Sequence, residues 1–75
     1  MKYYVVREHS RVHSSIIQIK RTKCTDDWTR VNNYKNCWQF SKEGAKKICD
    51  RENKADKGWY KYYMIDVQSL EDANS

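Results

Sequence analysis

The first two apolar runs of the chain have the composition of β-strands. Residues 3–6 read Tyr-Tyr-Val-Val, and residues 15–20 carry Ile17 and Ile19 at the alternate spacing that points two side chains to one face. The polar stretch between the two runs is short enough to be a hairpin loop. The pattern therefore predicts an N-terminal β-hairpin.

The next segment, residues 23–39, fits no single element. Trp28, Val31 and Trp38 recur at a helical spacing, whereas three asparagines in the same stretch favour turns. A loop and a third strand near Trp28 to Val31 fit the sequence equally well. We interpret the stretch as an irregular segment that Trp28 and Trp38 hold in place.

The clearest helix signal covers residues 40–53. Ser41 can cap the helix by accepting a hydrogen bond from a free backbone N–H of the first turn. Phe40 and Ala45 stand at the two positions of a hydrophobic staple. Ala45, Ile48 and Cys49 then fall on one narrow apolar face, because side chains three and four residues apart are neighbours on a helix. The pattern predicts one helix that packs through this face.

The longest apolar run follows Gly58 and covers residues 59–67. Aromatic and β-branched residues dominate it, which predicts a strand central enough to have both faces largely covered. Residues 69–75 are acidic and carry little that could pack, so we expect a frayed tail after a single domain that covers residues 1–68.

These elements predict an α+β fold in the order strand, strand, irregular segment, helix, strand. The sheet should be short and mainly antiparallel, with one helix packed on one face. Leu, Ile, Val and Phe together number only twelve in 75 residues, whereas nine of the ten aromatic residues are Trp or Tyr. Since each such ring buries roughly 150–250 Å², we expect the aromatic side chains to build the core.

Two absences narrow the class of protein. No run approaches the roughly 18 apolar residues of a membrane span, and the first residues lack the apolar region of a signal peptide. Cys24, Cys37 and Cys49 are an odd number of cysteines, which fits reduced thiols that pack as small hydrophobic residues. We therefore expect a cytoplasmic chain with no membrane partner.

Positive charge is concentrated near the N-terminus. The net charge is +5, and residues 1–23 alone hold six Lys or Arg and one acidic residue. Clustered cations attract phosphates or an acidic protein face, so this basic hairpin is the candidate contact surface. Its expected cationic contacts are Arg7, Arg11, Lys20, Arg21 and Lys23, and the expected aromatic contacts are Trp28, Tyr34 and Trp38. The cations of the predicted helix have acidic neighbours, and we interpret them as solvated surface.

The chain lacks the usual signatures of catalysis and metal binding. Its cysteines are separated by twelve and eleven residues, whereas zinc ligands typically occur in close pairs. His9 and His13 lie in the expected hairpin loop, and Asp26 and Asp27 suit a turn better than an acid–base couple. We therefore expect no enzymatic activity, no metal and no cofactor.

One stretch carries a family resemblance. Residues 37–49, Cys-Trp-Gln-Phe-Ser-Lys-Glu-Gly-Ala-Lys-Lys-Ile-Cys, followed by Tyr-Lys-Tyr-Tyr-Met-Ile at 60–65, resemble the helix and aromatic strand of many small bacteriophage accessory proteins. Such proteins are similar in size and composition to anti-CRISPR and other anti-defence inhibitors. The resemblance implies a non-enzymatic antagonist in the host cytosol that occupies a host protein, often one that handles nucleic acid. It carries over no site residues.

Two functional hypotheses follow. The first is a phage-type accessory protein that binds and inhibits a host defence or nucleic-acid-processing protein. The alternative is a small basic protein that binds RNA or DNA directly through the Arg- and Lys-rich hairpin. The oligomeric state stays open in both.

Overall fold

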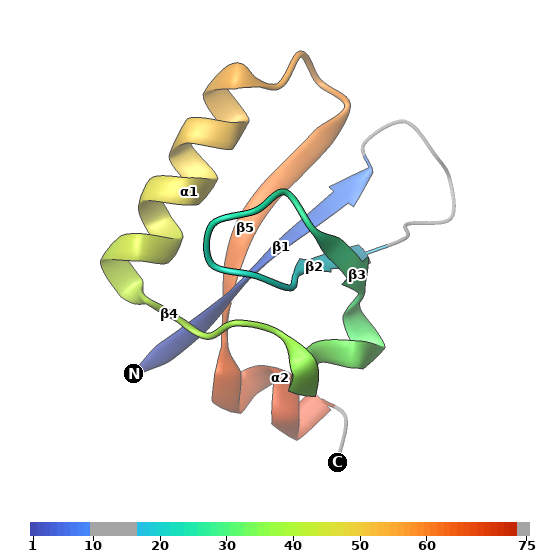
Figure 1. Cartoon of the computed structure of the whole chain (residues 1–75), viewed down its shortest axis with the longest axis vertical. Helices are drawn as coiled ribbons and strands as arrows, with labels where there is room; N and C mark the ends of the chain where they lie inside the picture. Colours follow the sequence, from blue (N-terminus) through green and yellow to red (C-terminus); the bar gives the residue numbers. More distant parts are fainter. Residues whose placement is uncertain (10–16, 74–75) are drawn as a thin grey trace.

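The structure is a computed structural model that describes residues 1–9 and 17–73. Its elements follow in the order β1 (Lys2–His9), β2 (Ile17–Lys20), β3 (Trp28–Arg30), the 3₁₀-helix η1 (Val31–Asn36), β4 (Phe40–Ser41), α1 (Lys42–Ala55), β5 (Tyr60–Asp66) and α2 (Val67–Ala73). The strands form one antiparallel sheet, so the predicted α+β class is confirmed (Figure 1). The loop expected around Arg11 and His13 falls outside the described residues.

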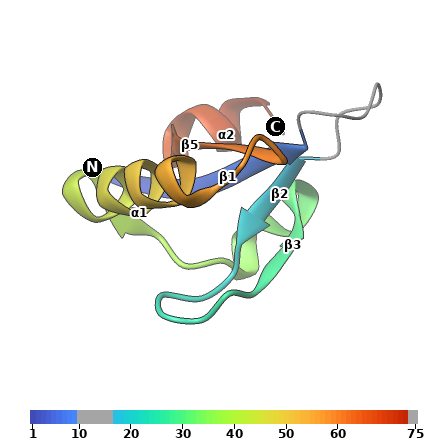
Figure 2. The ribbon, with the colours of Figure 1, turned by 90° about the horizontal axis from the view of Figure 1, so that it is seen from above.

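The strand at the centre of the sheet is β1. It pairs with β5 along one edge, and with β2 and β4 along the other, while β3 continues the sheet from β2. Figure 2 shows β2 and β3 bending away from β1 and β5, so that the sheet is curled. Among the described residues β5 pairs only with β1. The prediction of a central C-terminal strand is therefore wrong in position, although side chains from both faces of β5 pack in the core clusters.

The two faces of the sheet bury different clusters. Alternation along β1 sends Tyr4 and Val6 to one cluster and Val5 to the other. The first cluster lies against η1 and α2, and the second lies under α1. Aromatic rings contribute to both, but the largest side chains with less than 2% exposure are Tyr4, Ile19, Val5 and Val6. The core is thus a mixture of rings and β-branched side chains, and not mainly aromatic as predicted.

Helix α1 begins as the sequence predicts. The backbone N–H of Gly44 donates to Ser41 Oγ at 3.1 Å, which confirms the N-cap. Phe40 and Ala45, the expected staple pair, are both buried in the cluster under the helix. The helix continues to Ala55, two residues beyond the predicted end.

Side chains at the end of α1 hold the outer edge of β5. The Asn53 side chain donates from Nδ2 to the Tyr62 carbonyl at 2.8 Å and accepts from the Tyr62 N–H at 2.9 Å. Asp56 Oδ1 accepts from the N–H groups of Trp59 and Tyr60 at 2.6 and 3.1 Å. The turn between them needs a φ of 93° at Gly58, which glycine adopts without steric cost. The chain therefore enters β5 in a fixed register.

The segment expected to be irregular is ordered. The third strand left open by the sequence exists as β3, and η1 follows it directly. Tyr34 of η1 packs edge-to-face on Tyr4, with ring centroids 6.0 Å apart. This contact with β1 explains why a stretch rich in asparagine takes up regular structure.

The expected frayed tail is also corrected, because residues 67–73 form α2. Asp66 Oδ1 accepts from the N–H groups of Gln68 and Ser69 at 2.7 and 3.2 Å, which caps the first turn. Leu70 is 6% exposed and belongs to the cluster around Tyr4. The C-terminal helix is therefore part of the domain as far as the described residues extend. No helix in the described part of the chain is long and apolar enough to cross a membrane.

Candidate binding surface

Arg7 lies between two aromatic rings. Its guanidinium carbon is 4.3 Å from the centroid of the Trp28 ring and 4.2 Å from that of Tyr60. The Nε of Arg7 also donates to Gln18 Oε1 at 2.8 Å, across the β1–β2 pair. The sequence predicted a free contact residue, whereas these contacts hold Arg7 in a half-buried position that joins β1, β2, β3 and β5.

Lys20 is the one charged or polar residue among the buried side chains of the described residues, with 7% exposure. Its Nζ donates to the Thr25 carbonyl at 2.6 Å and lies 5.6 Å from the centroid of the Trp28 ring. Trp28 is therefore close to both Arg7 and Lys20. The ammonium group of Lys20 holds the loop at residues 21–27 against the sheet, which limits its use as an outward contact.

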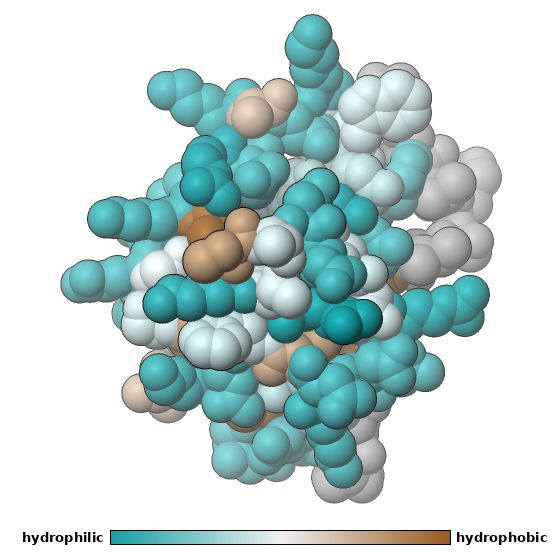
Figure 3. Space-filling view, viewed as in Figure 1, coloured by the Kyte–Doolittle hydropathy of each residue, from teal (hydrophilic) through white to brown (hydrophobic). Residues whose placement is uncertain are grey.

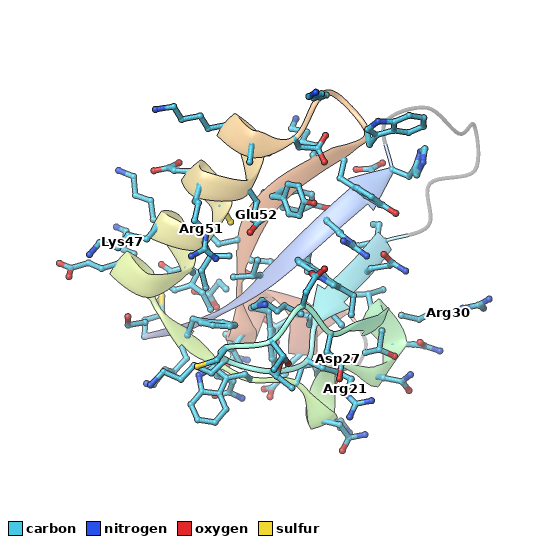
Figure 4. The ribbon with its side chains drawn as sticks, turned by 45° about the horizontal axis from the view of Figure 1, so that its top comes forward. Arg21, Asp27, Arg30, Lys47, Arg51 and Glu52 are labelled. Carbon is cyan, nitrogen blue, oxygen red and sulfur yellow. The ribbon has the colours of Figure 1, made fainter. Side chains whose placement is uncertain are left out.

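Arg21, Lys23 and Trp38 form an exposed group, called here the Trp38 surface. The Trp38 side chain is 47% exposed, and Lys23 Nζ lies 5.8 Å from its ring centroid. The Trp38 N–H donates to the Arg21 carbonyl at 3.0 Å, which fixes the two backbones side by side. Arg21 Nε is 3.6 Å from Asp27 Oδ2 in a solvent-exposed ion pair (Figure 4). The group combines an exposed indole with two exposed cations.

Buried neighbours hold Trp38 in place. Cys37 and Phe40 are both buried, in the clusters on opposite faces of the sheet. The Cys37 N–H donates to the Tyr34 carbonyl at 3.1 Å at the end of η1. Because residues before and after it are anchored, the indole is presented from a fixed backbone.

The structure divides the predicted site residues. Tyr34 and Lys20 are each 7% exposed, so both are buried and neither is accessible to a binding partner as the sequence predicted. Trp28 is half-buried under Arg7, and Arg11 lies outside the described residues. Arg21, Lys23 and Trp38 remain together on one surface.

A pocket that the sequence analysis missed lies between α1 and the loop at residues 21–27. It measures about 320 Å³, and it is lined by Arg7, Lys20, Cys24, Thr25, Asp26, Trp28, Ile48, Arg51, Glu52 and Tyr62. Arg51 and Glu52 follow Ile48 by three and four residues, so helical spacing places all three on one flank. That spacing is the only sequence signal for this pocket. It does not predict a cavity, because the opposite wall is the loop at residues 21–27, whose position the sequence does not give. Figure 3 shows the face with α1 and this loop as largely hydrophilic, with small apolar areas between them.

The three cysteines occupy different environments. Cys24 is exposed, whereas Cys37 and Cys49 are buried, and all three are free thiols. Burial, and to a lesser degree the nearby Asp50 carboxylate, raises the pKa of the Cys49 thiol to about 11. Burial also raises the pKa of Cys37, with Arg21 opposing the shift. The two buried thiols are therefore protonated and unreactive at neutral pH. Within residues 1–9 and 17–73, no three metal-ligating side chains are grouped together.

Comparison of the chain with protein-family models, with curated proteins and with solved structures found no match.

Proposed function

We propose that this protein is a non-enzymatic binding protein that inhibits a partner by covering an acidic face of it with the Trp38 surface. The partner class is the one that the phage-type resemblance implies, a host protein of defence or nucleic-acid processing. Trp and Arg are the side chains most enriched among residues that dominate binding energy at protein interfaces. The observation that carries the proposal is an indole that is 47% exposed, with the Lys23 ammonium 5.8 Å from its ring centroid and the exposed Arg21 bonded to it through the backbone.

Preorganisation supports this assignment. An exposed Trp on a mobile loop loses conformational entropy on binding, which weakens association. Here the buried neighbours Cys37 and Phe40 and the hydrogen bond from Trp38 to Arg21 already fix the backbone. Lys23 and Arg21 then favour a carboxylate-rich partner and speed the encounter with it.

Charge layout favours a protein over a nucleic acid. A nucleic-acid track needs several cations free to follow the phosphates, each releasing a counterion. Two of the expected hairpin cations, Arg7 and Lys20, are half-buried and buried, so they do not lie along an exposed track. The remaining group is compact and centred on one indole, which suits a hot spot better than a strand of phosphates.

The test compares two exposed indoles in a pull-down from a nuclease-treated host lysate. Trp38→Ala should lose a specific captured protein, while Trp59→Ala, which removes a 52% exposed indole elsewhere, should retain it. Reversing Arg21 and Lys23 to Glu should abolish capture without unfolding the domain, because both side chains are exposed. Lys20 is left unchanged, because a carboxylate at that buried position would destabilise the fold. Equal capture by wild type and Trp38→Ala would refute the proposal.

Direct nucleic-acid binding is the competing result of the same experiment. It would appear as capture that nuclease abolishes, together with a gel shift whose affinity falls steeply as salt rises. That outcome would replace the protein partner with RNA or DNA.

A further inference from the structure

The pocket between α1 and the loop at residues 21–27 gathers three cations from three elements. Arg7 comes from β1, Lys20 from β2 and Arg51 from α1. None of the three residues of the Trp38 surface lines it. The pocket is thus a separate feature of the molecule, and an inference about it does not depend on the proposed function.

Two of these cations have no carboxylate partner in the described part of the chain. The ion pairs there are Arg21 with Asp27 and Arg51 with Glu52. Lys20 is 7% exposed, yet its ammonium is bonded to a neutral carbonyl oxygen and faces an aromatic ring. Buried cations are normally paired, because removing a charge from water is costly. Arg7 and Lys20 therefore have no direct ion partner, and the lining, with Asp26 and Glu52 counted against its three cations, keeps a net charge of +1.

The acidic residues in the lining are already engaged. Asp26 Oδ1 accepts from the indole Nε1 of Trp28 at 2.6 Å. Glu52 Oε1 lies 3.5 Å from Arg51 Nη2, and Figure 4 shows these neighbours side by side on α1. An exposed pair of this kind contributes little and is readily exchanged. An incoming anion can therefore replace Glu52 as the partner of Arg51.

Unused donors complete the site. An ammonium group has three N–H donors and a guanidinium has five. The hydrogen bond to Thr25 uses one donor of Lys20, and the hydrogen bonds to Gln18 and to the Tyr62 side chain use two of Arg7. Oxygen anions form short, strong hydrogen bonds with such charged donors. The rings of Trp28 and Tyr62 form an apolar wall beside the cations, and the volume of about 320 Å³ leaves room for a group that carries the anion.

We propose that this pocket binds an oxyanion, a phosphoryl or carboxylate group of a ligand, between Arg7, Lys20 and Arg51. Arg7 and Lys20 supply the fixed part of the site, because ring contacts and backbone hydrogen bonds hold them in place. Arg51 supplies the exposed part, which turns from Glu52 to the ligand.

The direct test is a titration of the wild-type protein followed by two-dimensional NMR. Inorganic phosphate and acetate are added separately at constant ionic strength, with chloride as the reference. We expect saturable shifts at the amides of Thr25 and Arg51 and at the indole N–H of Trp28, with at least one of the two anions. Saturation by phosphate alone assigns a phosphoryl group, and saturation by acetate alone assigns a carboxylate. Shifts that stay linear and match those of chloride with both anions would overturn the proposal.

Substitutions at three positions of α1 test whether binding depends on this pocket or on general positive charge. Arg51→Gln should weaken binding of the saturating anion about fivefold, because it removes one charged donor near the surface. Glu52→Gln should tighten binding, since it removes the competing carboxylate. Lys47→Gln makes the same charge change as Arg51→Gln on the same helix but outside the pocket lining, and it should leave affinity unchanged. Equal weakening by the Lys47 and Arg51 variants, or none by Arg51→Gln, would show that the assigned site is wrong.

Discussion

Arg7→Met tests whether the guanidinium between Trp28 and Tyr60 stabilises the domain. The variant keeps an unbranched side chain for packing but removes the charge, both ring contacts and the hydrogen bond to Gln18. At a half-buried position each ring contact contributes about 0.5–1 kcal/mol, and a hydrogen bond from a charged donor contributes about 1.5 kcal/mol. We therefore expect the free energy of unfolding to fall by about 2.5–3.5 kcal/mol.

The loss is large enough to measure and small enough to leave a folded protein. A domain of this length has a total stability of about 4–11 kcal/mol, and the expected loss lowers the Tm by about 10–28 °C. Urea unfolding followed by circular dichroism gives the free energy, and a thermal scan gives the Tm.

The matched control is Arg30→Met on β3. Arg30 is exposed, and Figure 4 shows its side chain pointing away from the molecule. Its substitution should change stability by no more than about 0.5 kcal/mol, as at other surface positions. If Arg7→Met also stays within that range, the ring contacts contribute nothing to stability. A double-mutant cycle with Tyr60→Leu checks the mechanism, because additive losses would show that the two side chains do not interact.

Three further predictions concern the helices and the buried thiol. Leu70→Ala should lower the free energy of unfolding by about 2–3 kcal/mol, while Ser69→Ala beside it on α2 should not. Equal stabilities of the two variants would show that this segment is a frayed tail and does not pack on the domain. Because the pKa of the Cys49 thiol is raised from 9.0 to about 11, the unfolded chain releases this proton first, so stability should fall as pH rises from about 9 to about 11. The urea midpoints measured at about pH 9 and about pH 11 should differ less in Cys49→Ala than in the wild-type protein. Asn53→Ala should lower the free energy of unfolding by about 1–2 kcal/mol, because two hydrogen bonds to β5 are lost. Asp50→Ala on the same helix should leave that free energy unchanged or raise it. Unfolding in urea measures both variants.

The sequence predicted best those elements whose signals are local. Ser41 identified the start of α1 by a bond that spans three residues, and the run at residues 59–67 contained β5. The missed helix α2 also has a local cap at Asp66, but the sequence pattern predicts a strand that continues through this residue to Val67. The helix packs through Leu70 and the partly buried Val67, and their burial requires the finished sheet. Two apolar side chains three residues apart are too few to establish a helical period.

The candidate site was harder to predict because its members are distant in sequence. Charge counting found the cations of the first hairpin, but it could not distinguish Arg7, which lies between two rings, from Lys23, which is exposed. That distinction depends on Trp28 and Tyr60, which only the folded sheet brings to Arg7. The sequence predicts solvated surface at Arg51, because the loop that forms the other wall of its pocket lies far away in the chain.

The Asn53 side chain also affects how two molecules of this protein can associate. The outer edge of β5 offers backbone groups that could template a strand from a second chain and so seed aggregation. At Tyr62 both groups on that edge are already bonded to Asn53, and at Tyr60 the N–H is bonded to Asp56. An extended polypeptide that approaches this part of the edge cannot pair with these backbone groups, because they are already hydrogen-bonded. The residues Asn53 and Asp56 therefore hinder strand addition at the Tyr60–Tyr62 part of β5, without proline and without a covering strand.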